Sequence, residues 1–222
     1  MKFTTSLLLA TLAVATPAAL LRAQAVPSTI SQAAGSEQTV EPIFWPKEGR
    51  PKLNVSSFYT DFDGIDVPMI QLQVDSLNVL LSNRKTLRAR GSNSYRYSGE
   101  LTDSRLPGVS LGLSVFKVDE FLPDLSDQSW NAYKAGLAAE LPNAEIVLDN
   151  SNIGQAITPY VFGEQFRQIV YEQATPKAIV KRREIFAFVN SRLLVFTVSG
   201  TKAAVDQNWT SIEHLISEMS RS

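Results

Sequence analysis

The sequence predicts an α+β fold, an antiparallel sheet with helices on both faces. Residues 179–200, IVKRREIFAFVNSRLLVFTVSG, have the pattern of two apolar strands folded back on each other at Asn190-Ser191. Residues 203–219 follow directly with the apolar spacing of a helix, and residues 126–141 have a second helix pattern. Because the hairpin strands are apolar on both faces, each face needs a cover, and the two helices can supply it.

Asn190-Ser191 predicts a two-residue turn, because Asn tolerates a positive φ. The turn predicts four cross-strand pairs, two on each face of the hairpin: Phe188 with Leu193, Phe186 with Val195, Ile185 with Phe196, and Ala187 with Leu194. In the helix of residues 203–219, apolar residues recur every three or four positions and form one stripe: Val205, Trp209, Ile212, Ile216 and Met219.

The remaining elements follow from the same patterns. Strands are predicted over residues 55–62 and 65–73, joined at Asp63-Gly64, which favours a type I′ turn. Further strands are predicted over residues 77–81, 95–101, 109–118, 146–148 and 162–173, with turn-rich connections over residues 83–93 and 102–108. The helix of residues 126–141 has Ser126 as its expected N-cap, and its apolar stripe is Trp130, Tyr133, Leu137 and Leu141.

The first 25 residues have the features of a secretory signal peptide. A positive start at Lys2 precedes an apolar run, and Ala23-Gln24-Ala25 fits a small-x-small cleavage site. A retained membrane anchor is the weaker alternative, since the run is short for a span and contains Pro17. We expect residues 1–25 to be a signal peptide, residues 26–51 a flexible tail and residues 52–222 a single domain, with no transmembrane segment after cleavage. In the tail, Phe44-Trp45 forms an apolar island that packs either on the domain or on a partner.

Composition limits the function classes. The chain has 222 residues, of which 44% are hydrophobic, enough for one well-packed core. Residues 1–25 contain Lys2 and Arg22 and no acids, so 21 basic residues become 19 against 22 acidic ones, a net charge of about −3. A slightly acidic protein is not expected to bind nucleic acid. The sequence contains no cysteine, which excludes disulfides and a lipid-anchored cysteine.

The C-terminal part of the chain resembles a known family. A strand ending near Tyr171, a hairpin with Asn at its turn, the return strand LLVFTVSG and a closing helix with Trp209 resemble the C-terminal half of PsbP-type domains. Exported bacterial DcrB-like proteins share that α/β/α sandwich. The resemblance covers residues 162–220, and the first half of the chain agrees in strand order. It implies a non-enzymatic accessory or binding role and brings no catalytic motif with it.

Residue types that carry catalysis or metal binding are sparse. His214 is the single histidine and is expected on the polar side of its helix. Without cysteine or a second histidine, the chain lacks the parts of a zinc site or of a Ser-His-Asp triad. The segment DFDGID is similar to the start of a calcium loop, but the twelfth position from Asp61 is Leu72, which has no ligand oxygen in its side chain. We predict no catalytic residue, no metal site and no cofactor.

The densest basic segment is the predicted partner-binding surface, and it contains Arg84, Lys85, Arg88 and Arg90. Such a cluster can attract an anionic lipid, an anionic polymer or an envelope protein. The alternative interpretation is structural, since Lys and Arg on edge strands block unwanted strand pairing. Lys181-Arg182-Arg183 is a second basic segment with the same two interpretations.

Two function classes remain. The first is an exported, non-catalytic binding or accessory protein, periplasmic or secreted, that acts through surface contacts. The alternative is an exported acid-dependent hydrolase that uses Asp119, Glu120 and Asp124 for carboxylate catalysis with water as nucleophile. Facing carboxylates in a deep pocket would favour the hydrolase, and a shallow basic or apolar groove would favour the binding protein.

Overall fold

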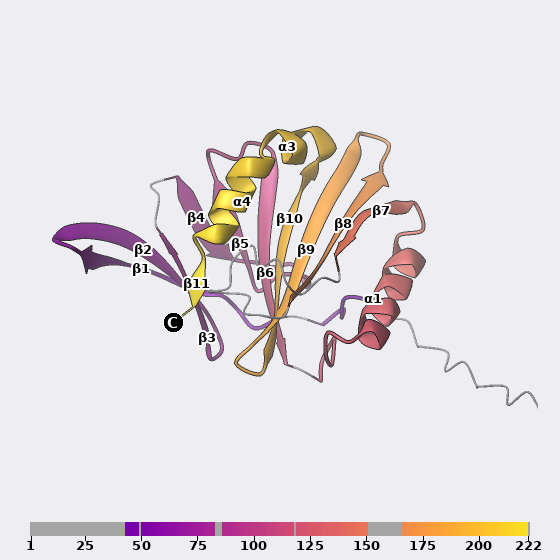
Figure 1. The fold of residues 1–222 in the computed structure, drawn as a ribbon, viewed down its shortest axis with the longest axis horizontal. Helices are drawn as coiled ribbons and strands as arrows, with labels where there is room; N and C mark the ends of the chain where they lie inside the picture. Colours follow the sequence, from indigo (N-terminus) through magenta and orange to yellow (C-terminus); the bar gives the residue numbers. More distant parts are fainter. Residues whose placement is uncertain (1–42, 49, 83–85, 118, 151–165, 222) are drawn as a thin grey trace, which may run out of the picture. The chain divides into compact units, whose positions relative to one another are not determined.

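The computed structural model describes residues 43–48, 50–82, 86–117, 119–150 and 166–221. By its internal contacts the chain divides into Met1–Gln38 and Thr39–Ser222, and every described residue belongs to the second unit. The described strands of that unit form two antiparallel sheets, accompanied by a few helices (Figure 1). The predicted α+β class is therefore confirmed.

The larger sheet has seven strands in the order β4-β5-β6-β10-β9-β8-β7. In that order the strands are Leu87–Gly91, Gly99–Asp103, Val109–Lys117, Arg192–Thr201, Ile179–Val189, Phe166–Ala174 and Ala144–Asn150. At its centre is the β9–β10 hairpin, and all four predicted cross-strand pairs are present in its register. Asn190 and Ser191 have φ of 49° and 59°, the left-handed values that a type I′ turn requires.

The smaller sheet has four strands in the order β1-β2-β3-β11. These strands are Asn54–Phe62, Ile65–Val74, Leu77–Ser82 and Ser220–Arg221. Asp63 and Gly64 have φ of 53° and 80°, so the predicted turn between β1 and β2 is confirmed. The outer part of this hairpin extends away from the seven-stranded sheet (Figure 1).

The helices of the described residues are α1 (Asp127–Glu140), α3 (Lys202–Gln207) and α4 (Trp209–Ser217). Ser126 is the N-cap of α1, as predicted, and its side chain accepts a hydrogen bond from the N–H of Ser129. The prediction of one helix over residues 203–219 is wrong, because the helix is interrupted at Asn208, between α3 and α4. The side-chain amide of Asn208 donates to the carbonyl of Ala204 at 2.8 Å, and this local bond competes with regular helix geometry.

The buried apolar residues form two clusters. The first core cluster contains Val205, Ile212, Leu215 and Ile216 from α3 and α4, and the second contains Trp130, Tyr133 and Leu137 from α1. Successive residues of β9 alternate between them, since Ile185 and Ala187 belong to the first cluster and Phe186 to the second. Both sides of the central strands are therefore packed, as their continuous apolar pattern predicts.

The apolar island near the N-terminus packs on the domain. Trp45 is only 3% exposed and belongs to the second core cluster, in edge contact with Phe116 at 5.6 Å between ring centroids. The N–H of Ile43 donates to the carbonyl of Ala132 in α1 at 2.8 Å. The expected flexible tail of residues 26–51 thus includes, from residue 43 onward, a segment that packs on the core, so the packed chain begins before residue 52.

One predicted connection, residues 83–93, and one predicted strand, residues 95–101, differ from the structure. Residues 87–91 form β4 although residues 83–93 were expected to be turn-rich, because this strand is short and polar and is defined by its pairing with β5. Residues 95–98 are not a strand, and the strand of this region, β5, begins at Gly99. Among the helices of the described residues, none is long and apolar enough to cross a membrane.

Candidate functional site

A polar surface lies on one side of strands β4, β5, β6, β10 and β9. Its residues follow from the strand register, in which a row of direct neighbours crosses the five strands: Arg90, Glu100, Gly112, Thr197 and Glu184. A second row, two positions along each strand, contains Arg88 beside Thr102, and Ser199 beside both Ser110 and Arg182. By the two-residue alternation of strands, these side chains share the side of Phe186 and Val195. We call this surface the polar face.

The polar face is hollowed by a pocket of about 280 Å³. Its lining residues are Arg90, Tyr97, Glu100, Leu101, Thr102, Ser110, Leu111, Arg182 and Ser199. Tyr97 is positioned by Gly112, where an added Cβ would lie 2.4 Å from two carbons of the tyrosine ring. Small residues on the central strands and an aromatic ring above them thus leave a hollow with hydroxyl groups at its base and arginines on two sides.

Arg182 is the cation of this hollow that is least exposed to solvent. Its Nη1 donates to the hydroxyl of Tyr171 at 3.4 Å, while its buried Nε has no hydrogen-bond partner among the described residues. Burial lowers the pKa of Arg182, but the neighbouring Tyr171, Tyr97 and Glu184 outweigh that effect, and the net shift is upward. The guanidinium therefore stays charged, and its Nε is a donor that no described residue accepts from.

A buried carboxylate fixes the position of the residues behind the hollow. Glu184 is 0% exposed and accepts hydrogen bonds from the hydroxyls of Tyr133 and Tyr171, the latter at 3.0 Å. Burial and the charge of Glu184 raise the pKa of Tyr133 well above its usual value, so Tyr133 remains a donor. The Glu184 side chain is thus held by groups from α1 and β8, next to Arg182 on the same side of β9.

Arg90 and Glu100 form the opposite wall. Arg90 Nη2 lies 2.8 Å from Glu100 Oε2, and Ser92 donates to Glu100 Oε1 at 2.9 Å. The Arg90 side chain is 76% exposed, so this pair is open to solvent and to exchange with another anion.

The predicted basic segment contributes part of this site. Arg90 lines the hollow, and Arg88 is exposed on the same strand and borders an adjoining depression that includes Thr102. Arg84 and Lys85 lie outside the described residues. Arg182 was not among the predicted site residues, although the sequence placed it in the second basic segment with the same two interpretations.

Another residue of the second basic segment, Arg183, has structural contacts. Arg183 points to the side of the first core cluster, where it donates to Gln168 at 2.8 Å and pairs with Glu213. Its guanidinium also lies 4.8 Å from the centroid of the Trp209 ring, and this ring is half-buried. Arg182 and Arg183 therefore have different environments although they are adjacent in sequence.

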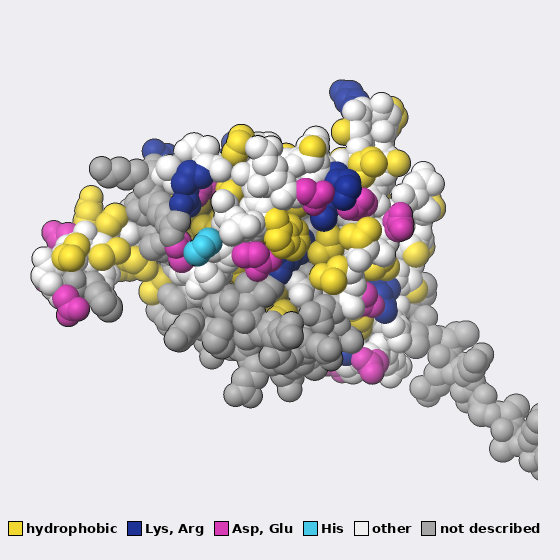
Figure 2. Space-filling model, turned by 45° about the horizontal axis from the view of Figure 1, so that its top comes forward, with side chains coloured by type: hydrophobic (Ala, Val, Ile, Leu, Met, Phe, Trp, Pro, Cys, Tyr) yellow, Lys and Arg dark blue, Asp and Glu magenta, His cyan; other side chains and the backbone are white. Residues whose placement is uncertain are grey.

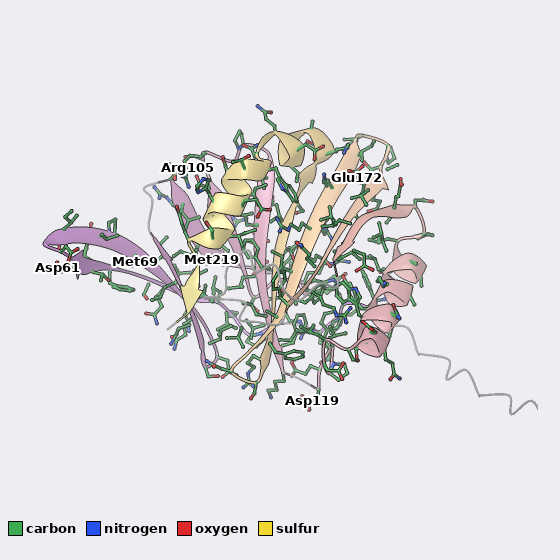
Figure 3. All side chains as sticks on the ribbon, in the orientation of Figure 1. Asp61, Met69, Arg105, Asp119, Glu172 and Met219 are labelled. Carbon is green, nitrogen blue, oxygen red and sulfur yellow. The ribbon has the colours of Figure 1, made fainter. Side chains whose placement is uncertain are left out.

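Two of the three acids of the alternative hydrolase, Glu120 and Asp124, accept local hydrogen bonds. Glu120 accepts from the N–H of Lys117 at 3.0 Å, and Asp124 accepts from the N–H of Ser126 at 3.0 Å. The hydrogen bonds from the side chains of Ser126 and Ser129 lower the pKa of Asp124, whereas a general acid needs a raised pKa. Asp119, labelled in Figure 3, lies below the ends of the central strands in that view. His214 is exposed, and the described residues contain no group of three acids or histidines able to hold a metal ion.

Neither a protein-family model nor a curated protein sequence matches the chain. Among solved structures, the chain is similar to cyanobacterial PsbP (CyanoP) from Synechocystis sp. PCC 6803, at 12% identity and a TM-score of 0.46, over 65% of this chain and 86% of that one. It is also similar to LpqN, involved in cell envelope biogenesis of Mycobacterium tuberculosis, at 11% identity and a TM-score of 0.41, over 76% and 92%. A protein of unknown function from Pseudomonas aeruginosa, PA94, matches at 12% identity and a TM-score of 0.38, over 71% and 92%.

A PsbP protein, of the family that the hairpin and closing helix resemble in sequence, is thus among the structures to which the chain is similar. The roles of individual residues follow from the contacts of this chain alone.

Proposed function

We propose that the protein is an exported, non-catalytic binding or accessory protein, periplasmic or secreted, whose contact surface is the polar face. Its scaffold is an α/β/α sandwich, with α1 over one side of the seven-stranded sheet and α3 with α4 over the other. The ligand is the phosphate group of an anionic envelope lipid or polymer. The predicted segment Arg84, Lys85, Arg88 and Arg90 supplies the outer positive charge.

One observation carries this proposal: Arg182 lines the hollow, and its buried Nε has no hydrogen-bond partner among the described residues. An acceptor that enters the hollow meets a guanidinium that local groups hold only in part, and it can gain a charge-assisted hydrogen bond. The hydroxyls of Ser110, Ser199 and Tyr97 line the same hollow and can donate to further phosphate oxygens. A volume of about 280 Å³ suits a head group and excludes a folded partner from the base of the site.

Binding is tested with two probes that separate the sources of phosphate. Phosphatidylglycerol vesicles, with phosphatidylcholine vesicles as the neutral comparison, test a lipid surface by co-sedimentation. Glycerol 3-phosphate, titrated in a calorimeter, tests the free anion. We expect retention on the anionic vesicles that weakens with salt, because exposed charges act over about 10 Å at 0.1 M salt.

Arg182→Gln should weaken this binding about tenfold or more, since a hydrogen bond to a charged group contributes about 1.5–3 kcal/mol. Ser199→Leu fills the hollow and leaves Arg182 in place, so it should weaken binding even if Arg182→Gln lowers stability. Replacing the four residues of the basic segment with Ser should remove the salt-sensitive part. Arg192→Gln is the matched control, because Arg192 is ion-paired with Asp75 at 2.6 Å and does not line the hollow.

Unchanged binding by both Arg182→Gln and Ser199→Leu would exclude the hollow as the site. Loss of binding by the control Arg192→Gln as well would mean that net charge alone is being measured. Binding of glycerol 3-phosphate without vesicles would identify a soluble phosphate ligand, and binding of vesicles alone would identify a lipid surface.

A further inference from the structure

The β1–β2 hairpin exposes apolar side chains that the polar face does not use. Tyr59 is 73% exposed, Ile65 66%, Val55 40% and Phe58 37%. Figure 2 shows hydrophobic and acidic side chains together on this hairpin, which extends at the left of the view. Asp61, labelled in Figure 3, lies near its far end. Such a surface on an extended element is typical of an interaction site.

The outer edge of β1 lacks the features that protect edge strands. Strand β1 is the first strand of its sheet, so one side of its backbone pairs with β2 and the other side pairs with no strand among the described residues. Its nine residues contain no Lys, Arg or Pro, and its register with β2 is continuous from Asn54 to Phe62, without a bulge. Natural edge strands usually carry such features to prevent pairing with another strand.

We infer that β1 pairs in antiparallel fashion with β1 of a second copy of this chain, centred on Phe58. This register uses the whole strand, because it sets Asn54 of one copy opposite Phe62 of the other. Next to a two-residue turn, Phe62 and Ile65 exchange backbone hydrogen bonds, so every second residue before Phe62 bonds inward to β2. Residues 55, 57, 59 and 61 then present their N–H and C=O groups outward.

The same register satisfies those outward groups. Ser57 of one copy faces Tyr59 of the other, and Val55 faces Asp61, so residues with outward groups always meet. The two Phe58 side chains face each other across the two-fold axis as a close, non-hydrogen-bonded pair. Aromatic pairs of this kind stabilise antiparallel strands by roughly 0.2–1 kcal/mol.

Charge favours this arrangement over one that brings the hairpin tips together. Asp61, Asp63 and Asp66 are the charged residues of the hairpin from Asn54 to Gln73, and all three lie near the turn. In the register centred on Phe58, the acidic tip of each copy lies beside the start of β1 in the other. The exposed Lys52, two residues before β1, then lies close to the acidic tip of the other copy. A parallel arrangement would instead set the acidic tips against each other.

Sedimentation velocity over a range of concentrations tests the pairing. We expect a monomer–dimer equilibrium for the full chain. Phe58→Lys sets two cations face to face and should weaken the dimer at least tenfold. Lys52→Gln should weaken it less and reduce its salt dependence. Ile65→Lys, on the strand away from the interface, is the matched control and should leave the dimer unchanged. A wild-type monomer at all concentrations would overturn the inference, as would equal effects of Phe58→Lys and Ile65→Lys.

The absence of cysteine from the sequence allows a direct test of register. Under mild oxidation, Phe58→Cys should give a disulfide-linked dimer, because residue 58 faces its own copy at a distance suited to a disulfide. Thr60→Cys should not, because residue 60 faces Ser56 and lies four positions from residue 60 of the second copy. Cross-linking at residue 60 that equals or exceeds that at residue 58 would exclude this register.

Discussion

Tyr133→Phe tests the buried hydrogen bonds behind the polar face. The substitution removes one oxygen and keeps the ring, whose contacts with Trp130 and Phe186 have centroid distances of 5.4 and 4.9 Å. Tyr133 and Glu184 are both 0% exposed, so water cannot replace the lost donor without entering the core. The carboxylate keeps the hydroxyl of Tyr171 and loses that of Tyr133.

A hydrogen bond to a charged group contributes about 1.5–3 kcal/mol to stability, and we expect Tyr133→Phe to lower the free energy of unfolding by that amount. In a domain of this size, 1 kcal/mol shifts Tm by about 2–4 °C, so the melting temperature should fall by roughly 3–12 °C. Urea unfolding followed by tryptophan fluorescence and a thermal melt by circular dichroism measure both quantities.

Two controls separate the hydrogen bond from other effects of removing an oxygen. Tyr95→Phe removes an exposed hydroxyl that accepts from Arg96 Nε at 3.3 Å, and it should cost about 0.5 kcal/mol or less. In a Glu184→Gln background, Tyr133→Phe should cost about 1 kcal/mol less than in the wild type, because its charged partner is gone. Equal costs in both backgrounds would refute the assignment of Glu184 as the partner that stabilises Tyr133.

Two further predictions concern the packing of the N-terminal segment and acid stability. Gly136→Ala should lower the free energy of unfolding by about 1–3 kcal/mol, although Ala favours helices. The reason is that the added Cβ would lie 1.8 Å from the carbonyl oxygen of Ile43. A gain in Tm would contradict this packing. Hydrogen bonds from Arg105 outweigh burial and lower the pKa of Asp103 below the usual 3.8, so its stabilisation is present above about pH 4 and is lost as pH falls further. Asp103→Asn should therefore destabilise by about 1–3 kcal/mol near pH 7 and by much less near pH 2, as urea melts at the two pH values can measure.

Local sequence predicted the elements whose signals are local. Asn190-Ser191 and Asp63-Gly64 set two hairpins and their registers, because a two-residue turn fixes which residues pair. Ser126 likewise set the start of α1, because an N-cap side chain bonds to a backbone N–H only three positions further along the sequence. The division of the last helix at Asn208 was missed because apolar spacing alone does not report a side-chain amide that bonds to the backbone.

The candidate site depended on contacts between distant segments. Arg182 is far from Arg90 and Tyr97 in the sequence, and the three residues line one hollow because β4 and β9 lie in the same sheet with β5, β6 and β10 between them. The order of strands within a sheet is set by long-range pairing, which no local pattern encodes. The sequence identified Arg84–Arg90 and Lys181–Arg183 as basic segments, while only the register of β9 showed that Arg182, and not Arg183, lines the hollow.

The sequence by itself determined the α+β class, the central hairpin, the apolar face of α1 and the scarcity of residues for metal or triad chemistry, since each depends on residue type and short spacing. Only the tertiary structure decided that Trp45 is buried in the second core cluster, that Arg182 lines a hollow while Arg183 packs against Trp209, and that β1 is an edge strand. Adjacent residues of a strand point to opposite faces, so the environment of each depends on what the rest of the chain packs against that face.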